Sequence, residues 1–348
     1  MILEKVKEGG VEIFVPKVNK LTAKNPAFFN PVQVTNRDVS VLLASCLLKK
    51  EATVLDLLSA TGVRAVRFAK EACLRNVFAN DVNPTAAKLI KKNAAHNKAK
   101  SKIFNLRAHE FLSRKYQLNQ KIYFDYIDVD PFGTPVPFLD ATVKALVPNG
   151  GIIAVTATDT ANLCGVNVNA CRRIYGAVPS HGELMHEIGI RILLKKIIEV
   201  GAQYDIALTP IFCHSTLHYM RVYLRAESGA KKADEILKNI GMYQTAGPMW
   251  LGRLWDEKLV EKIFELALNK KNISAETKKL LFIILAESKI NVFGFYDLAK
   301  IRFKQTPKIN DVISRLHAAG FQAARTHFSE SGVRTNADKK NFVSIIKK

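Results

Sequence analysis

The feature that most constrains the fold is an alternation of short β-rich runs with helical segments between residues 53 and 226. Apolar, β-branched composition marks seven runs as strands, at 53–58, 76–81, 102–107, 123–129, 151–158, 204–212 and 218–226. Amphipathic segments lie between them, such as 63–72, 84–97, 138–146 and 182–200. This order is typical of a parallel sheet covered by helices. The sequence therefore predicts an α/β domain built on seven strands.

A change in composition after this region predicts a second domain. At 348 residues the chain is long for one core. The stretch 226–235, "AESGAKKADE", is small and polar, so we expect residues 1–226 and 227–348 to form separate domains. The second part is mainly helical and rich in lysine, and it ends in a helix stopped by Gly320 followed by a strand and turn. This order predicts a small α+β unit that is winged-helix-like.

The charge balance indicates a polyanionic partner. Lys and Arg number 52 against 31 Asp and Glu, for a formal net charge of +21. Nucleic acid is the first candidate for a partner of such a chain. The sequence start lacks the apolar core of a signal peptide, and no apolar run reaches the roughly 18 residues of a membrane span. We therefore expect a cytoplasmic protein without a membrane partner.

The segment "LDLLSATGVRAVRF", residues 55–68, passes from a strand through a tight turn into a helix. Asp56 lies within the strand. Ser59, Thr61 and Gly62 are small enough for a ligand to approach the backbone at the helix N-terminus. The G-x-G-x-x-G pattern that cradles a pyrophosphate is absent from this turn.

An acidic residue follows the second strand, as a nucleoside site requires. Asp81 stands at the end of that strand, with Val82 directly after it. A carboxylate there accepts hydrogen bonds from both hydroxyls of a ribose. A small-residue turn or a strand-end aspartate is individually common in packing and capping roles. Together they predict a cofactor that has adenosine but no phosphates, and S-adenosylmethionine fits this description.

The fourth strand ends in "DVDPFG", residues 128–133, where proline and glycine stop it. The Asp130 carboxylate and the Pro131 carbonyl provide two acceptors for the hydrogens of an exocyclic amine, whose lone pair is otherwise delocalised into its base. Phe132 is placed to stack on that base. The alternative is a turn with capping carboxylates. After the fifth strand, Asp159 either positions the target base or caps the next helix.

Seven segments together resemble one known family, the archaeal and eukaryotic tRNA (guanine-26-N2)-dimethyltransferases. The likeness runs from about residue 7 to the C-terminus. In chain order it is carried by "NPVQVTNRDVS", "LDLLSATGVRAVRF", "DVDPFGTPVPFLDATV", "GGIIAVTATDTANLCG", "HGELMHEIGIRIL", "GPMWLG" and "ARTHFSESGVRT". The resemblance implies a class I, Rossmann-like, seven-stranded methyltransferase domain with a distinct C-terminal domain that binds tRNA. It also implies S-adenosylmethionine as the cofactor and one or two methyl transfers to N2 of guanine 26 in tRNA.

The resemblance also implies roles for residues that spacing alone does not single out. Arg37 and Arg64 match family arginines at the cofactor, and Phe28 matches an aromatic residue that holds the guanine against Phe132. Asp81 and Asp130 match the ribose-binding and catalytic acids.

The chain departs from the family after the third strand. Relatives carry an acidic residue and an alanine for the adenine, whereas Ala108 and His109 stand at those places, so either Glu110 or a backbone group replaces the acid. Some relatives carry a cysteine-rich zinc insertion, but this chain lacks the cysteine spacing that the insertion requires. We therefore predict no metal.

Two other functions are compatible with parts of the pattern. The acceptor geometry at Asp130 also suits an amino-methyltransferase acting on adenine N6 or cytosine N4 of RNA or DNA. A basic RNA-binding protein without enzymatic activity is the second alternative. No obligate protein partner is evident from the sequence.

Overall fold

The computed structural model describes residues 2–17, 27–114, 122–216, 218–301 and 307–347. Its centre is a seven-stranded sheet with the order β5-β4-β3-β6-β7-β9-β8. The strands are β3 (Thr53–Asp56), β4 (Asn76–Asn80), β5 (Ser101–Phe104), β6 (Tyr126–Val129), β7 (Ile152–Ala157), β8 (Ile206–Thr216) and β9 (Tyr219–Ser228). β3 to β7 pair in parallel, whereas β9 is antiparallel to both β7 and β8. The predicted α/β class and its seven strands are confirmed.

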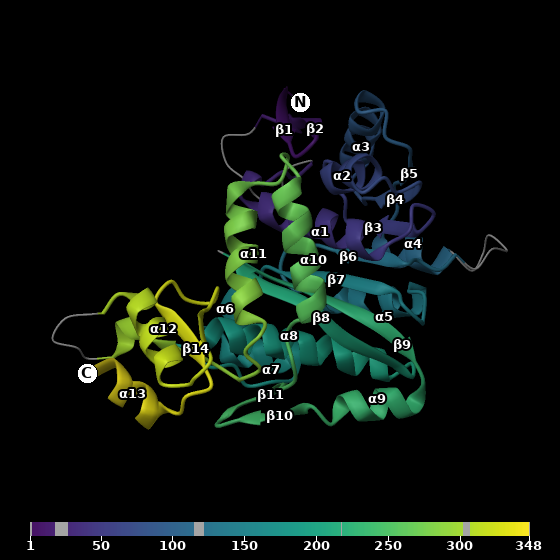
Figure 1. The fold of residues 1–348 in the computed structure, drawn as a ribbon. Helices are drawn as coiled ribbons and strands as arrows, with labels where there is room; N and C mark the ends of the chain where they lie inside the picture. Colours follow the sequence, from purple (N-terminus) through teal and green to yellow (C-terminus); the bar gives the residue numbers. More distant parts are fainter. Residues whose placement is uncertain (1, 18–26, 115–121, 217, 302–306, 348) are drawn as a thin grey trace.

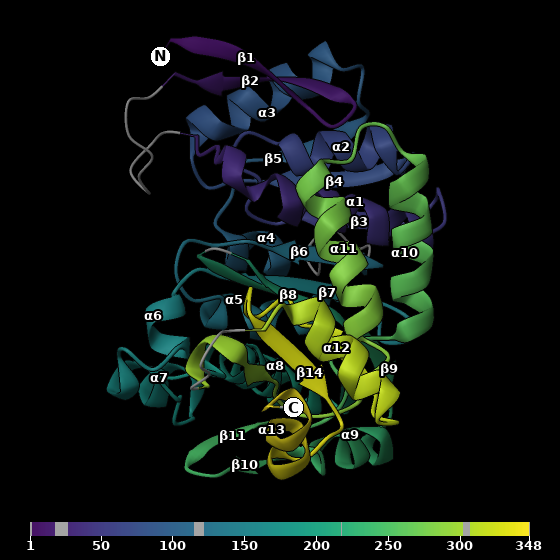
Figure 2. The same ribbon diagram turned by 60° about the vertical axis from the view of Figure 1, so that its left-hand side comes forward.

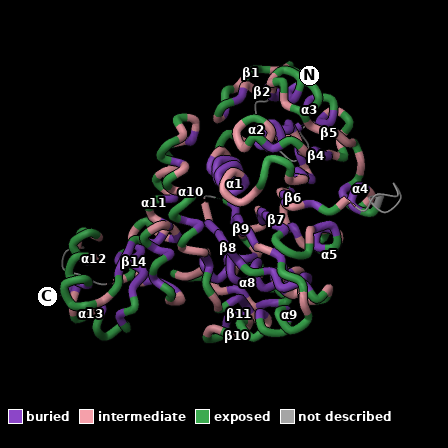
Figure 3. Tube along the Cα trace, turned by 45° about the vertical axis from the view of Figure 1, so that its right-hand side comes forward, coloured by how far each residue is buried: buried purple, intermediate pink, exposed green. Residues whose placement is uncertain are grey.

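Helices cover both faces of this sheet (Figure 1). One layer contains α1 (Val34–Leu47), α2 (Val63–Glu71) and α3 (Pro84–His96); the other contains α4 (Ala108–Arg114), α5 (Val136–Ala145) and α8 (Met185–Ala202). The strands between the two layers are mostly buried, apart from the edge strand β5 and the ends of β8 and β9 (Figure 3). Two short helices, α6 (Thr160–Leu163) and α7 (Val168–Tyr175), follow β7 and contact each other and α8.

An N-terminal hairpin adds to the cavity side of the domain. β1 (Leu3–Glu8) pairs antiparallel with β2 (Val11–Pro16), and β2 packs on α3. The amide of Asn93 in α3 bonds the Phe14 backbone on both its N–H and its carbonyl. The 3-10 helix η1 (Pro31–Gln33) then leads into α1. Strands are predicted from the sequence only from residue 53 onward, so the short alternating pattern of this hairpin is missed.

The elements after β9 divide into two packing groups. α9 (Ala230–Leu237), β10 (Ile240–Tyr243), β11 (Ala246–Trp250), α10 (Glu257–Asn269) and α11 (Ala275–Glu287) pack on the main hydrophobic core. In Figure 2, α10 and α11 stand side by side next to α1. A separate core lies beyond them and includes Leu298, Val312, Leu316 and Phe342.

The separate core belongs to a small α+β unit, as predicted. It contains β12 (Tyr296–Asp297), the 3-10 helix η2 (Leu298–Lys300), α12 (Ile309–Ala318), β13 (Ala323–Arg325), β14 (Gly332–Thr335) and α13 (Lys339–Lys347). The strands form a sheet in the order β12-β14-β13. α12 ends just before Gly320, whose φ of 85° suits a residue without a side chain. The division at residue 226 and the winged-helix-like character stay predictions.

A buried ionic cluster joins this small unit to the rest of the protein. Arg334 in β14 pairs with Glu187 of α8 at 2.8 Å and with Glu287 of α11 at 3.0 Å, and all three side chains are fully buried. Glu287 also bonds His327 Nδ1 at 2.7 Å. Although burial favours the neutral acid, His327 and Arg334 hold the pKa of Glu287 at about 2. Three segments far apart in the sequence are therefore held by one set of charges.

Candidate functional site

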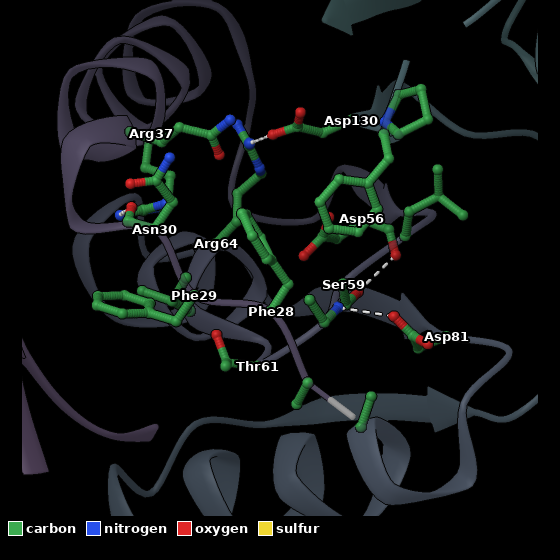
Figure 4. A pocket seen from close by; sticks show the side chains of 18 of the residues that line it. Phe28, Phe29, Asn30, Arg37, Asp56, Ser59, Thr61, Arg64, Asp81 and Asp130 are labelled. Atoms are coloured by element: carbon green, nitrogen blue, oxygen red, sulfur yellow. Dashed lines mark hydrogen bonds and ion pairs between the residues drawn. The ribbon is translucent and has the colours of Figure 1, made fainter. Parts of the chain in front are cut away.

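A cavity of about 620 Å³ opens at the carboxyl ends of β3, β4 and β6 (Figure 4). Strand ends of a parallel sheet meet at one edge, and this edge is where α/β proteins bind ligands. The cavity brings together most of the predicted site residues, which come from segments up to about 100 residues apart. Its lining includes Phe28, Arg37, Asp56, Ser59, Thr61, Arg64, Asp81, Val82, Asp130, Pro131 and Phe132.

The turn after β3 has the conformation that the small residues predicted. The Ser59 hydroxyl donates to the Asp56 carbonyl at 2.7 Å, and the Ser59 N–H donates to the Asn80 carbonyl at 2.9 Å. Gly62 precedes α2 with a φ of 77°, and a Cβ there would lie 2.8 Å from the Ile90 side chain. Gly62 is absent from the cavity lining. Its missing side chain therefore serves the turn and the packing of α2 on α3.

Asp81 fixes this turn against β4. Its Oδ2 accepts from the Ala60 N–H and its Oδ1 from the Asn83 N–H, both at 2.8 Å. Each carboxylate oxygen retains a second lone pair for a ligand. Burial raises the pKa of Asp81, although the two backbone N–H groups oppose the rise. The side chain thus both orders the turn and lines the cavity, with Val82 beside it, 56% exposed.

On the side of the cavity formed by β3 and the turn after it, two buried polar atoms have no hydrogen-bond partner within the described part of the chain. They are Asp56 Oδ2 and Thr61 Oγ1. Burial raises the pKa of Asp56 to about 7. Arg64 opposes this rise, and the nearby Asp128 carboxylate adds to it. An unpaired buried polar group destabilises a protein by about 1–3 kcal/mol. Both atoms are therefore suited to bind a polar or cationic ligand in the cavity.

Arg64 links the cofactor side of the cavity to the Asp-Pro-Phe-Gly loop. Its Nη2 forms an ion pair with Asp130, and its Nη1 donates to Ser40 Oγ at 2.6 Å and Asn36 Oδ1 at 2.9 Å. Figure 4 shows the guanidinium pointing at the Asp130 carboxylate. The Asp130 side chain is 13% exposed, on the open side of this pair. Arg64 therefore fixes the orientation of the carboxylate while leaving it accessible to a ligand.

Asp128, two residues before Asp130, is held in a buried ion pair. Arg221 Nη2 in β9 bonds Asp128 Oδ2 at 2.5 Å, and the Tyr126 hydroxyl donates to the same oxygen at 2.9 Å. Although burial favours the neutral acid, Arg221 and Arg64 hold the pKa of Asp128 below its usual value. Asp128 thus provides a buried negative charge that pairs with Arg64 at 3.3 Å.

The Asp-Pro-Phe-Gly loop is fixed to the end of β7. Gly133 N donates to Thr158 Oγ1 at 2.6 Å, and Thr158 N donates back to the Gly133 carbonyl at 3.0 Å. Gly133 has a φ of 77°, which favours glycine. This anchoring holds Phe132 at the cavity mouth with 52% of its surface exposed.

Phe28 and Phe132 contact each other directly. Their ring centroids lie 4.6 Å apart with an interplanar angle of 82°. A base stacked between two parallel rings needs a ring separation of about 7 Å, twice the usual contact distance between carbon atoms. The two rings must therefore separate before a base can lie between them.

Arg37 lines the cavity, but its guanidinium contacts the N-terminal hairpin. Nε and Nη2 each bond a Glu8 carboxylate oxygen at 2.6 Å, and Nη2 also bonds the Asn30 carbonyl at 3.0 Å. Burial opposes the charged form of Glu8, but Arg37 and Arg67 lower its pKa overall. Arg37 thus fixes the segment that carries Phe28 at the edge of the cavity.

The residues predicted for the adenine do not reach the cavity. Ala108 is buried at the start of α4, and His109 is exposed; neither is part of the lining. The His109 ring stacks on Phe138 with centroids 5.9 Å apart, and Phe138 lines the cavity. The cofactor role of Ala108 and His109 stays a prediction, and of the two only His109 has a ring contact with a residue of the lining.

Several residues of the site escaped the prediction from sequence. Asn36, Ser40, Tyr219 and Arg221 lie around Arg64 or line the cavity. For Tyr219 and Arg221 the available signal was "HYMRVY", where polar residues alternate on what is otherwise a buried strand. Asn36 and Ser40 lie in "NPVQVTNRDVS", a segment that carries the family resemblance. Asp159 accepts from the Tyr175 hydroxyl at 2.7 Å and from the Asn162 amide at 3.0 Å, contacts that anchor α6 and α7.

Two other kinds of feature are absent from the residues that the structure describes. Among them, no group of three or more His, Cys, Asp or Glu side chains is arranged to hold a metal ion. Within the same residues, no helix has the length and apolar character needed to cross a membrane.

Comparisons with known proteins match nearly the whole chain. The family model for N2,N2-dimethylguanosine tRNA methyltransferases matches residues 9–245 and 240–347. The tRNA (guanine(26)-N(2)/guanine(27)-N(2))-dimethyltransferase of Aquifex aeolicus is 37% identical over 99% of this chain and 95% of its own. The tRNA (guanine(26)-N(2))-dimethyltransferase of Pyrococcus furiosus is 37% identical over 100% of this chain and 99% of its own.

A solved structure has the same fold. Trm1 from Pyrococcus horikoshii, solved as a complex with S-adenosyl-L-methionine, superposes with a TM-score of 0.87 at 35% identity, covering 99% of this chain and 100% of its own. The family resemblance seen in the sequence motifs is thereby confirmed over both the methyltransferase domain and the C-terminal region. The chain belongs to the N2,N2-dimethylguanosine tRNA methyltransferase family.

Proposed function

We propose that this protein uses S-adenosylmethionine to transfer methyl groups, one and then a second, to the exocyclic N2 of guanine 26 in tRNA. The observation that carries the proposal is the position of the two predicted halves of the site. The turn at Ser59–Thr61 with Asp81 and the loop with Asp130 line one cavity and are bridged by Arg64. A cofactor side and an amine-acceptor side are therefore within reach of each other.

The cavity wall fits S-adenosylmethionine. Asp81 is suited to accept from the ribose hydroxyls, and Val82 offers apolar contact to the adenine. Asp56 and Thr61 have the unpaired atoms that a positively charged methionine group would satisfy. The bound cofactor supplies an electrophilic methyl group on its sulfonium sulfur.

Asp130 and Pro131 act on the target amine. The Asp130 carboxylate and the Pro131 carbonyl accept its hydrogens, which draws the lone pair out of conjugation and towards the methyl group. When the nitrogen becomes cationic, Asp130 accepts the released proton. Arg64 orients Asp130 throughout, and Phe132 aligns the base after Phe28 moves away.

The proposal is tested by transfer of labelled methyl from S-adenosylmethionine to unmodified tRNA transcripts. We expect N2-methylated guanosine in a transcript with guanine at position 26 and no label when adenine replaces it. Because the Aquifex relative is named for positions 26 and 27, transcripts with guanine at either position alone identify the site.

Each other outcome points to one of the alternatives. Label that persists when neither position 26 nor position 27 carries guanine would indicate another target base, as for an enzyme acting on adenine N6 or cytosine N4. No label on any tRNA would favour a basic RNA-binding protein without enzymatic activity. The net charge of +21 supports tRNA as the partner in either case, and a cytoplasmic location stays a prediction.

The affinity for S-adenosylmethionine is expected to rise with pH up to about 7 and then level off. Asp56 is raised to a pKa of about 7 by burial, and a bound cation favours its ionised form, so binding below that pH releases a proton. The slope reaches at most about tenfold per pH unit for one proton. Calorimetric titration between about pH 5.5 and 8.5 measures it.

Asp56→Asn is the control for this pH dependence. The amide cannot ionise, so the variant loses the contribution of Asp56 and keeps the titrations common to both proteins, such as those of Asp81 and of the cofactor's own amine. Equal pH profiles in the two proteins would contradict a role for Asp56 at the cofactor cation.

A further inference from the structure

Tyr219 lies on the opposite side of Asp130 from the cofactor turn. In the sheet order β5-β4-β3-β6-β7-β9-β8, Asp56 and Asp81 end β3 and β4, Asp130 follows β6, and Tyr219 begins β9. Because β9 runs antiparallel, its first residue lies at the same edge as the carboxyl ends of the parallel strands. Tyr219 accordingly lines the same cavity as Asp130.

Because side chains alternate along a strand, Tyr219 lies on the face of β9 from which Arg221 pairs with Asp128. Arg221 and Tyr223 occupy the next positions on that face. Arg221 bonds Asp128, and Tyr223 contacts Ser40 Oγ at 3.0 Å, so both side chains are used within the protein. Tyr219 is the member of this row closest to the cavity.

The Tyr219 hydroxyl is buried, and no described residue pairs with it. The residue is 3% exposed, and its hydroxyl has no hydrogen-bond partner among the described residues. The Thr216 side chain is close enough to lower the pKa of Tyr219, but its hydroxyl bonds His214 Nδ1 at 2.8 Å and makes no contact of normal hydrogen-bond geometry with the phenol. A buried hydroxyl without a partner destabilises the folded state, so its retention calls for a ligand that pairs with it.

The Tyr219 hydroxyl is in its protonated form and can donate a hydrogen bond. Burial, Tyr223 and the Asp130 carboxylate all raise the pKa of Tyr219 above its ordinary value. The phenol therefore stays protonated at neutral pH. Tyr219 and Asp130 both line the same cavity.

We propose that the Tyr219 hydroxyl positions the target guanine by donating a hydrogen bond to a ring acceptor of the base while Asp130 and Pro131 hold its amine. The inference rests on the proposed function. Guanine offers O6 and N3 as acceptors on either side of the edge that carries N1 and N2. Along this edge O6 accepts, N1–H and N2–H donate, and N3 accepts, so a donor placed beside two acceptors complements one end of it.

Tyr219→Phe tests the inference because it removes only the hydroxyl. We expect the single-turnover rate of methyl transfer to guanine-26 tRNA to fall by about tenfold or more. The affinity for S-adenosylmethionine should stay unchanged. The melting temperature should stay equal or rise, because the free protein loses an unpaired buried group.

A matched control is Tyr204→Phe. The Tyr204 hydroxyl bonds Asp140 on the surface, so this variant should lose a little stability and keep the methylation rate. Wild-type protein that fails to methylate guanine 26 would overturn the proposed function itself. Active wild type with an equally active Tyr219→Phe variant would overturn only the present inference.

Two further results would also overturn the role of Tyr219 at the base. Weaker binding of S-adenosylmethionine by Tyr219→Phe would place the hydroxyl at the cofactor. A lower melting temperature would show that the hydroxyl is paired within the free protein.

Discussion

Replacing Asp130 with alanine is expected to reduce methyl transfer to tRNA by at least about 100-fold. The substitution removes the carboxylate that accepts the amine hydrogen and the released proton. Arg64 keeps its bonds to Asn36 and Ser40 and its 3.3 Å ion pair with Asp128, so the cavity wall should persist. Single-turnover rates with saturating S-adenosylmethionine measure the chemical step.

Binding of the cofactor separates loss of chemistry from loss of the cavity. Asp130→Ala should bind S-adenosylmethionine with nearly wild-type affinity, because Asp56 and Asp81, the acids proposed for the cofactor, come from the ends of β3 and β4 and not from the substituted loop. Asp140→Ala is the matched control, since that carboxylate is exposed and pairs only with surface groups. Near-normal turnover in Asp130→Ala would show that another group accepts the amine hydrogens.

Replacing Arg334 with methionine is expected to lower the free energy of unfolding by about 3–5 kcal/mol. Glu187 and Glu287 are fully buried and each loses a cation at 2.8 or 3.0 Å. The carbonyls of Val292 and Gly294, which accept from Arg334 Nη1 at 2.7 and 3.1 Å, lose their donor as well. Such buried groups cannot be rehydrated without opening the packing between α8, α11 and β14.

Urea unfolding followed by circular dichroism and by tryptophan fluorescence measures this loss. Trp255 is a local probe because its ring lies 5.6 Å from the Arg334 guanidinium. Arg253→Ala is the control: its pair with Glu257 is exposed, and we expect a change below about 1 kcal/mol. A loss in Arg334→Met no larger than in this control would mean that the buried cluster contributes little net stability.

Local patterns were enough to predict the main sheet and half of the site. The apolar composition of each run is enough to predict a buried strand. The conformations of the turn at Ser59–Gly62 and of the loop at Asp130–Gly133 depend on residues adjacent in sequence. Because parallel strands bring their carboxyl ends to one edge, the places of Asp81 and Asp130 at strand ends are enough to predict that the two lie near each other. Phe28, Arg37 and Arg64 came from the family resemblance, and only the fold explains their position.

The sequence by itself determined the α/β class, the strand order along the chain and the identity of the two site segments, since these depend on short-range periodicity. Only the tertiary structure decided which charges pair. Arg221 reaches Asp128 across 93 residues, and Arg334 reaches Glu187 across 147. No periodicity specifies such partners, because the packing of whole elements determines which side chains meet. The same packing leaves the Tyr219 hydroxyl buried beside the cavity with no partner within the described chain.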